Sequence, residues 1–169
     1  MQSTETIIQA GDVQGLKALI NQDSQLNTVE GLTETLQYLV LAANHVANKV
    51  ELAQMLIQAG AQLTAPLIAA GGVDNVAVAE ALLDAGAPID GDGYWSPLEE
   101  AFYFGQPGIV AMLIERGASI RNLRIAAGLG QLDRMEAFFT PDGELKPEAG
   151  DIAWPFGELP AETPGAPRT

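Results

Sequence analysis

Apolar residues recur at helical spacing along most of the chain, in short stretches that glycine-containing turns separate. The clearest stretch, residues 96–120, reads SPLEEAFYFGQPGIVAMLIERGASI. Ser96 and Pro97 are favoured at the N-cap and at the first position of a helix. An apolar face at i, i+3 and i+4 follows, made of Leu98, Ala101 and Phe102. The pattern predicts a first helix that ends near Gly105.

A second apolar stripe follows after the turn Gln106-Pro107-Gly108. It is made of Ile109, Val110, Leu113 and Ile114. Gly117 is expected to end this second helix, because glycine enters the left-handed conformation without a Cβ clash. Each helix of the pair has one apolar face. The pair is too small to bury both faces alone, so it needs neighbours of the same kind.

Similar stretches occur earlier in the chain. The segment AMLIERGASI at 111–120 matches ALLDAGAPI at 81–89 and QMLIQAGAQL at 54–63. Their glycines, Gly60, Gly86 and Gly117, are 26 (86−60) and 31 (117−86) residues apart. Helix pairs that recur near this period predict a solenoid.

These residues resemble a known family. Ser96-Pro97-Leu98 followed by Ala101 is similar to the T-P-L-H-x-A start of an ankyrin repeat, and APLIAA at 65–70 is a second such start. The resemblance extends over about residues 4–146. It implies an all-α fold, an ankyrin-like α-solenoid of about five helix-turn-helix repeats.

The expected repeats differ in their connections. The units expected are 4–27, 28–64, 65–90, 96–121 and 121–146. The β-hairpin finger typical between ankyrin repeats is expected to be missing after Thr64 and Arg121, because the next unit begins at once. The segment GDGYW at 91–95 is expected to be the one long finger. In the last unit, Met135, Phe138 and Phe139 are expected on the second helix, with Leu145 docking behind it.

The composition changes after the last unit. We expect a repeat domain over residues 1–146 and a Pro-rich acidic linker or tail over 147–169. One interpretation is that the protein continues into further repeats beyond Thr169. The alternative is an acidic tail that folds back through Trp154-Pro155-Phe156.

Charge and composition narrow the function classes. The formal net charge of −14 argues against nucleic acid as a partner. The chain has no cysteine, so we expect neither disulfides nor a thiolate zinc site, in keeping with a cytoplasmic location. No apolar run approaches the ~18 residues of a membrane helix, and no signal peptide is visible. We expect a monomer that does not bind membranes.

Candidate chemistry is sparse. Glu99 and Glu100 are adjacent acids on a predicted helix, and consecutive helical residues point about 100° apart, so the spacing does not make an acid–base pair. No carboxylate or thiolate partners His45 in the sequence, and no nucleophile, phosphate-loop or dinucleotide motif is present. We therefore expect no enzyme activity, no metal and no cofactor.

Three functional hypotheses remain. The first is a non-catalytic protein–protein interaction module that binds another protein or peptide, with a basic one preferred. The resemblance implies contacts at Asp92 and Trp95 on the finger and at Tyr103 and Phe104 at the helix end, beside Glu99 and Glu100. The second is a regulatory or targeting arm of a larger multidomain protein or enzyme truncated after Thr169. The third is a structural spacer, which predicts that Trp95 and Tyr103 are buried.

One packing hypothesis concerns the core between the third and fourth units. Phe102 occupies a site where other units have a small residue, and Gly71 stands at the matching site of the preceding unit. We expect Phe102 to be core and to fill the space that Gly71 leaves open.

Overall fold

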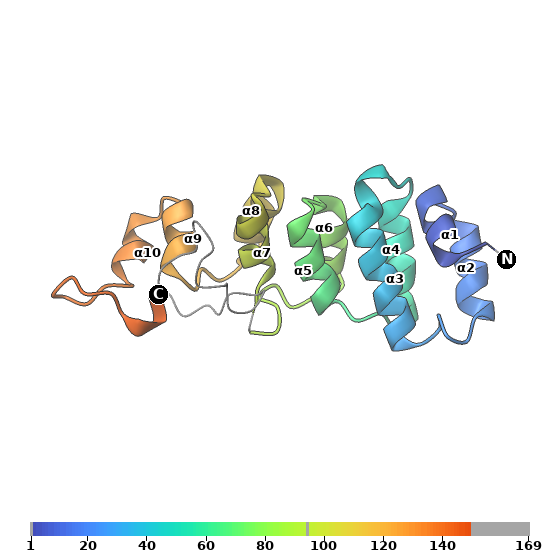
Figure 1. The fold of residues 1–169 in the computed structure, drawn as a ribbon, viewed down its shortest axis with the longest axis horizontal. Helices are drawn as coiled ribbons and strands as arrows, with labels where there is room; N and C mark the ends of the chain where they lie inside the picture. The colour runs from blue at the N-terminus through green and yellow to red at the C-terminus, as the bar shows by residue number, and fades with distance from the viewer. Residues whose placement is uncertain (1, 94, 150–169) are drawn as a thin grey trace, which may run out of the picture. The chain divides into compact units, whose positions relative to one another are not determined.

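The computed structural model describes residues 2–93 and 95–149. Within them the protein is all-α, with ten α-helices and no β-strand (Figure 1). The chain divides into two compact units, Met1–Ser119 and Ile120–Thr169. The all-α prediction is confirmed. The proposed boundary at residue 146 stays a prediction, and Tyr94, Trp154 and Phe156 lie outside the described residues.

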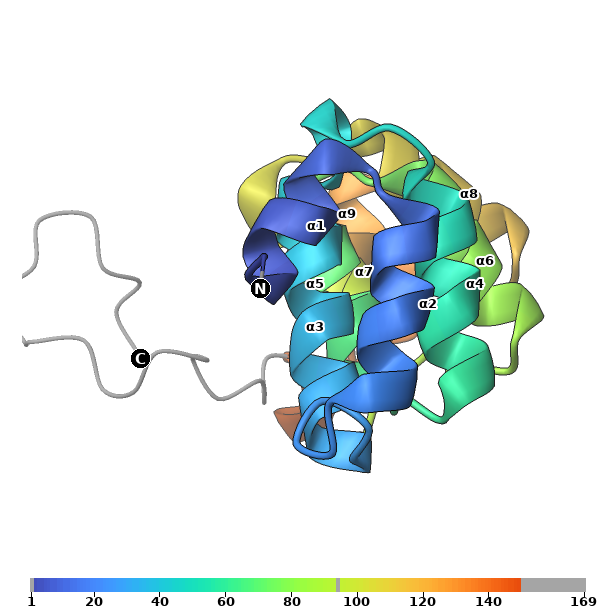
Figure 2. The ribbon, with the colours of Figure 1, turned by 90° about the vertical axis from the view of Figure 1, so that its right-hand side faces the viewer.

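The first unit contains eight helices arranged in two rows. Odd-numbered helices lie on one side and even-numbered helices on the other (Figure 2). Each odd helix packs on the next odd helix, and each even helix on the next even one. The helices are α1 Thr4–Ala10, α2 Val13–Gln22, α3 Val29–Ala42, α4 Lys49–Ala59, α5 Thr64–Gly72, α6 Val76–Asp84, α7 Pro97–Phe104 and α8 Pro107–Glu115.

The core lies between the two rows. The predicted apolar stripes are buried there, including Leu98 and Ala101 on α7 and Ile109 and Leu113 on α8. Leucines at helical spacing fill the same position on the other helices, namely Leu16, Leu32, Leu36, Leu39, Leu52, Leu56, Leu67 and Leu82. Helical periodicity therefore indicated most of the buried face of α7 and α8, although Phe102, Val110 and Ile114 of the predicted stripes are only half-buried.

Three even helices, α4, α6 and α8, end in the same way, whereas α2 ends at the extended residue Asp23. Gly60, Gly86 and Gly117 have φ of 110°, 93° and 90°, the left-handed region predicted for them. Each glycine donates its N–H to the carbonyl three residues back, and the following alanine donates to the carbonyl five residues back from itself. At Gly117 the two bonds are 3.1 Å to Ile114 and 2.9 Å from Ala118 to Leu113. This is the Schellman arrangement, which satisfies the last carbonyls of the helix.

Amide side chains connect successive helix pairs. The Asn48 Nδ2 donates to the Gly11 carbonyl at 3.0 Å, and the Asn75 Nδ2 donates to the Val40 carbonyl at 3.2 Å. The Gln106 Nε2 donates to the Gly72 carbonyl at 2.9 Å. Each donor stands between the odd and even helices of its pair, and each acceptor lies near the end of an odd helix in the preceding pair.

A further connection joins the turn after α5 to α8. Asp74 has a φ of 53°, a left-handed conformation that aspartate tolerates better than most residues. Its Oδ1 accepts the N–H of Ile109 at 2.8 Å. The carboxylate therefore caps the N-terminus of a helix in the next pair, where the helix dipole favours negative charge.

Helices α5 and α7 approach each other closely at Gly71 on α5. A Cβ at this position would lie 2.7 Å from the Pro97 carbonyl oxygen and 3.4 Å from the Ala101 nitrogen on α7. The expected pairing of Gly71 with Phe102 is therefore wrong, because Gly71 accommodates the backbone of α7. Phe102 itself is only half-buried.

The second unit has a short helix pair, α9 Leu123–Gly128 and α10 Leu132–Glu136, and a 3-10 turn at Pro147–Ala149. The expectation for its second helix is wrong, because α10 ends before Phe138 and Phe139. The chain instead turns back at Pro141, and Phe139 forms an isolated antiparallel bridge with Leu145. Leu145 is 53% exposed, so it does not pack behind the second helix of this unit as expected. Proline cannot donate a helical hydrogen bond, which explains why the helix does not extend through residue 141.

Candidate partner-binding surface

Helix α7 and the loop before it bring together the predicted site residues, but not all on the surface. Asp92 is exposed in the loop. Trp95 and Glu99 are only 7% and 4% exposed, which contradicts the expectation that both are available to a partner. Local capping interactions at the start of α7 explain both exceptions.

Trp95 directly precedes the N-cap residue Ser96. Its indole Nε1 donates to the Glu100 Oε2 at 2.5 Å. An apolar residue at this position often packs on an apolar fourth helical residue and fixes the angle at which the chain enters the helix, but here a hydrogen bond joins the two positions. Glu100 is that fourth residue, so Trp95 anchors the loop to α7 and is not a free contact residue.

Glu99 closes a capping box with Ser96. The Glu99 N–H donates to the Ser96 Oγ at 3.1 Å, and the Ser96 N–H donates to the Glu99 Oε2 at 2.7 Å. The side chain therefore points back to the helix start instead of sharing an exposed face with Tyr103. The sequence carried the signal, because Ser-x-x-Glu before an apolar run is the capping-box pattern.

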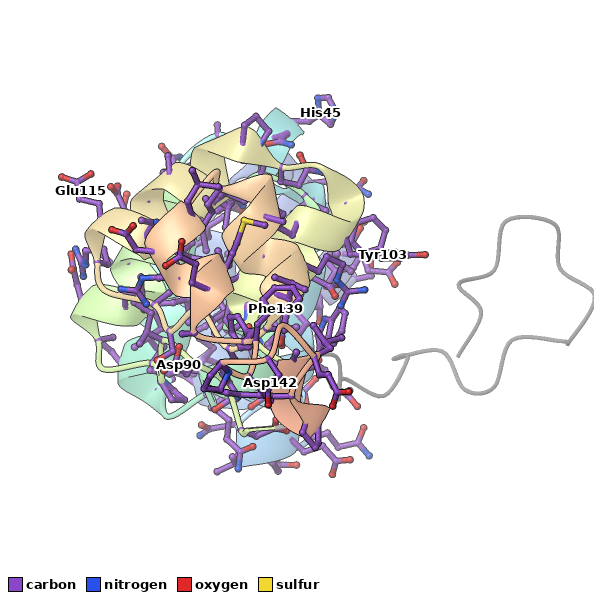
Figure 3. The ribbon with its side chains drawn as sticks, turned by 90° about the vertical axis from the view of Figure 1, so that its left-hand side faces the viewer. His45, Asp90, Tyr103, Glu115, Phe139 and Asp142 are labelled. Carbon is purple, nitrogen blue, oxygen red and sulfur yellow. The ribbon has the colours of Figure 1, made fainter. Side chains whose placement is uncertain are left out.

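Tyr103 and Phe104 are exposed as predicted, by 43% and 48%. Their rings meet edge to face, with centroids 4.9 Å apart and planes at 89°. Figure 3 shows Tyr103 pointing away from the ribbon. A Cβ on Gly72 would lie 3.4 Å from the Phe104 ring, so this ring lies over the end of α5.

Glu100 connects the loop to this aromatic pair. It is half-buried, and its Oε1 would be 3.3 Å from a Cβ on Gly72. Both Glu100 and Phe104 therefore border the same glycine on α5. The structure brings together three of the six predicted residues, Glu100, Tyr103 and Phe104, on one exposed face.

Sequence reasoning missed a second group on α3. Glu34, Tyr38 and Leu41 lie at i, i+4 and i+7, and Leu41 is 60% exposed. The Tyr38 hydroxyl accepts a hydrogen bond from the Gln9 Nε2 on α1 at 2.8 Å. The available signal was this polar–apolar stripe on the side of α3 away from its buried leucines.

Helix α5 lies between these two groups and presents small residues. Ala65, Ala69 and Gly72 repeat the i, i+4, i+7 spacing there. The Asn44 Nδ2, just beyond α3, donates to the Val73 carbonyl just beyond α5 at 3.2 Å. The exposed faces of α3, α5 and α7 are thus continuous. We call this the odd-helix surface, with principal side chains Glu34, Tyr38, Leu41, Glu100, Tyr103 and Phe104.

Other chemistry is limited in the part of the chain that the structure describes. There, no three His, Cys, Asp or Glu side chains come together as a possible metal site. His45 is exposed in the 3-10 turn Ala43–His45, and Figure 3 shows it pointing outward. Residues 2–93 and 95–149 also contain no helix long and apolar enough to cross a membrane. The expectation that the protein is not an enzyme stays a prediction.

Comparison with models of known protein families found no family that matches this chain. Comparison with curated proteins found no match either.

Proposed function

We propose that this protein is a non-catalytic interaction module that binds a partner protein or peptide through its odd-helix surface. In this proposal the helix pairs form an ankyrin-like α-solenoid of about five units. The module works as a cytoplasmic monomer without a cofactor. The proposal keeps the aromatic pair of α7 as the anchor and replaces Trp95 and Glu99 with residues of α3.

Recurring local structure supports the solenoid. The Schellman caps at Gly60, Gly86 and Gly117 are the same motif in three consecutive pairs. The amide bonds from Asn48, Asn75 and Gln106 each reach back to the preceding pair. A unit that contacts mainly its neighbours through repeated interactions is what a solenoid requires.

One observation carries the binding role, namely the exposed edge-to-face pair of Tyr103 and Phe104. Aromatic side chains bury a large area at little entropic cost, and they are enriched among the residues that dominate interface energies. The Phe104 ring lies beside Gly72 and meets the Tyr103 ring edge to face, so both contacts favour one arrangement of the rings before a partner arrives. A pre-organised aromatic surface reduces the cost of binding.

The test uses the intact chain as bait in an extract of the cells that produce it. Tyr103→Ala with Phe104→Ala is compared with wild type and with Leu132→Ala. Leu132 is 68% exposed on α10, which is not one of the helices that form the odd-helix surface, and serves as an apolar control. Enrichment is measured by quantitative mass spectrometry, and helicity and unfolding midpoint are measured for each variant.

We expect one protein that wild type and Leu132→Ala enrich equally and that the double variant loses, with unchanged helicity. The proposal fails if the folded double variant enriches the same proteins as wild type. A double variant that unfolds also contradicts it, because the two rings would then be part of the core.

A further inference from the structure

Acidic residues lie on both rows of helices in the first unit, but basic residues lie only on the even row. The odd helices carry Glu5, Glu30, Glu34, Glu99 and Glu100, and their sequences contain no lysine or arginine. The basic residues of positions 1–119 belong to the even row. Lys17 is on α2, Lys49 is on α4, and Arg116 directly follows α8.

The basic residue after α8 is already paired. The Arg116 Nη2 lies 2.5 Å from the Asp84 Oδ1, and this hydrogen bond raises the pKa of Arg116 above its ordinary value. Within the described residues, no such ion pair reaches Glu100, whose Oε2 accepts the Trp95 indole N–H. Glu34 is exposed, and no ion pair reaches it within the described residues. The odd-helix surface therefore combines uncompensated negative charge with exposed aromatic and aliphatic side chains.

Resting on the proposed function, we propose that the odd-helix surface binds a positively charged, amphipathic segment of the partner. Lysine or arginine side chains of this segment lie at Glu34 and Glu100. An apolar side chain of the segment lies over α5, between Leu41 and the Tyr103–Phe104 pair. Cations are attracted both by carboxylates and by aromatic faces, so the two kinds of contact favour the same partner.

The spacing of the helices sets the length of this segment. Packed helices lie about 8–10 Å apart, so α3 and α7 are about 20 Å apart across α5. A segment crossing all three needs about six residues if extended, at ~3.3 Å per residue. It needs about thirteen if helical, at 1.5 Å per residue. The small side chains of α5 leave the middle of the path open to an apolar residue.

A second copy of this chain fits the surface poorly. The chain carries a net charge of −14, so two odd-helix surfaces facing each other would bring like charges together. Like-charge juxtaposition is costly at an interface and slows association. A basic partner is attracted by the same charge.

The experiment titrates three synthetic fourteen-residue peptides onto the intact protein. The first alternates leucine and lysine in a helical amphipathic pattern. In the second every lysine is glutamate, and in the third every leucine is serine. Affinities are measured by calorimetry at low and high NaCl concentration. The protein variants are Glu34→Gln, Glu100→Gln and the matched control Glu51→Gln, whose exposed carboxylate is on α4.

We expect the lysine–leucine peptide to bind most tightly, and to bind more weakly at high salt because exposed charges are screened. Glu34→Gln and Glu100→Gln should each weaken it about two- to fivefold, as for exposed ion pairs, whereas Glu51→Gln should leave it unchanged.

Three results would overturn the inference. Equal weakening by Glu51→Gln would mean that the net charge attracts the peptide without a defined surface. Equal binding of the glutamate–leucine peptide would remove the charge preference. Self-association that Tyr103→Ala with Phe104→Ala abolishes, measured by sedimentation equilibrium, would identify a second copy as the occupant. The first two results leave the proposed function intact. Partner binding by the odd-helix surface is tested separately, by the capture experiment with Tyr103→Ala and Phe104→Ala.

Discussion

Glu99 and Glu100 are neighbours in the sequence, yet their carboxylates have separate roles. Glu99 turns back to the Ser96 N–H and completes a helix cap. Glu100 accepts the Trp95 indole N–H and borders Gly72, so it faces the odd-helix surface. Consecutive helical residues point about 100° apart, which is enough to give Glu99 a structural role and to place Glu100 on the surface.

Gly71 and Gly72 allow a matched test of helix packing. Either glycine-to-alanine change raises helix propensity by about 1 kcal/mol. At Gly71 the new methyl would lie 2.7 Å from the Pro97 carbonyl oxygen, a backbone atom, and overpacking of this kind costs about 1–3 kcal/mol. At Gly72 it would meet only the Glu100 and Phe104 side chains, which can move. We expect Gly71→Ala to lower the free energy of unfolding in urea and Gly72→Ala to preserve or raise it. Equal effects would contradict the close approach of α5 and α7.

The sequence predicted exposure correctly for some candidate residues of this region and wrongly for others. Tyr103 and Phe104 lie beyond the buried stripe of α7, so periodicity alone placed them outside. For Trp95 and Glu99, burial depends on hydrogen bonds to the start of the helix. Leu41 was missed because it stands in an apolar run, where only its spacing from Glu34 and Tyr38 separates it from the buried leucines.

At the scale of elements, the ends of helices were the most predictable features. A glycine after an apolar stripe indicated the left-handed cap in three even helices, and all three have positive φ. The last pair was less predictable. Met135, Phe138 and Phe139 have helical spacing, but Pro141 and Gly143 favour a turn that draws Phe139 out of the helix. Turn chemistry outweighed apolar spacing because α10 buries no side chain.

The cap at Gly117 gives a prediction at this scale. No atom lies within 4 Å of a Cβ built there, so a substitution is opposed by the backbone conformation alone. Gly117→Val should lower the free energy of unfolding by about 1–3 kcal/mol, as for other residues held at unfavourable φ. Gly117→Asn should lower it less, because asparagine tolerates the left-handed region. Urea unfolding of the three proteins checks the order, and a valine variant as stable as wild type would contradict it.

At the scale of the whole molecule, the two rows of helices in the first unit differ in what they offer a partner. The even row carries the basic residues and an ion pair between Arg116 and Asp84. The odd row carries the exposed Tyr103 and Phe104 rings, together with Glu34 and Glu100, which no ion pair reaches within the described residues. Sequence alone shows the acidic excess. Which charged residues share a row follows only from the arrangement of the helices, whose two rows Figure 2 shows.

Burial also predicts which helices unfold locally most often. Helix α3 buries five side chains between its neighbours, whereas α10 buries none. Local opening free energies range from near zero up to the global value, and buried helices open last. In hydrogen–deuterium exchange, the amides of α10 should therefore exchange fastest among the helices and those of α3 among the slowest, after correction for intrinsic rates. If the amides of α10 were as well protected from exchange as those of α3, the prediction would be wrong, because other residues would then have to bury α10.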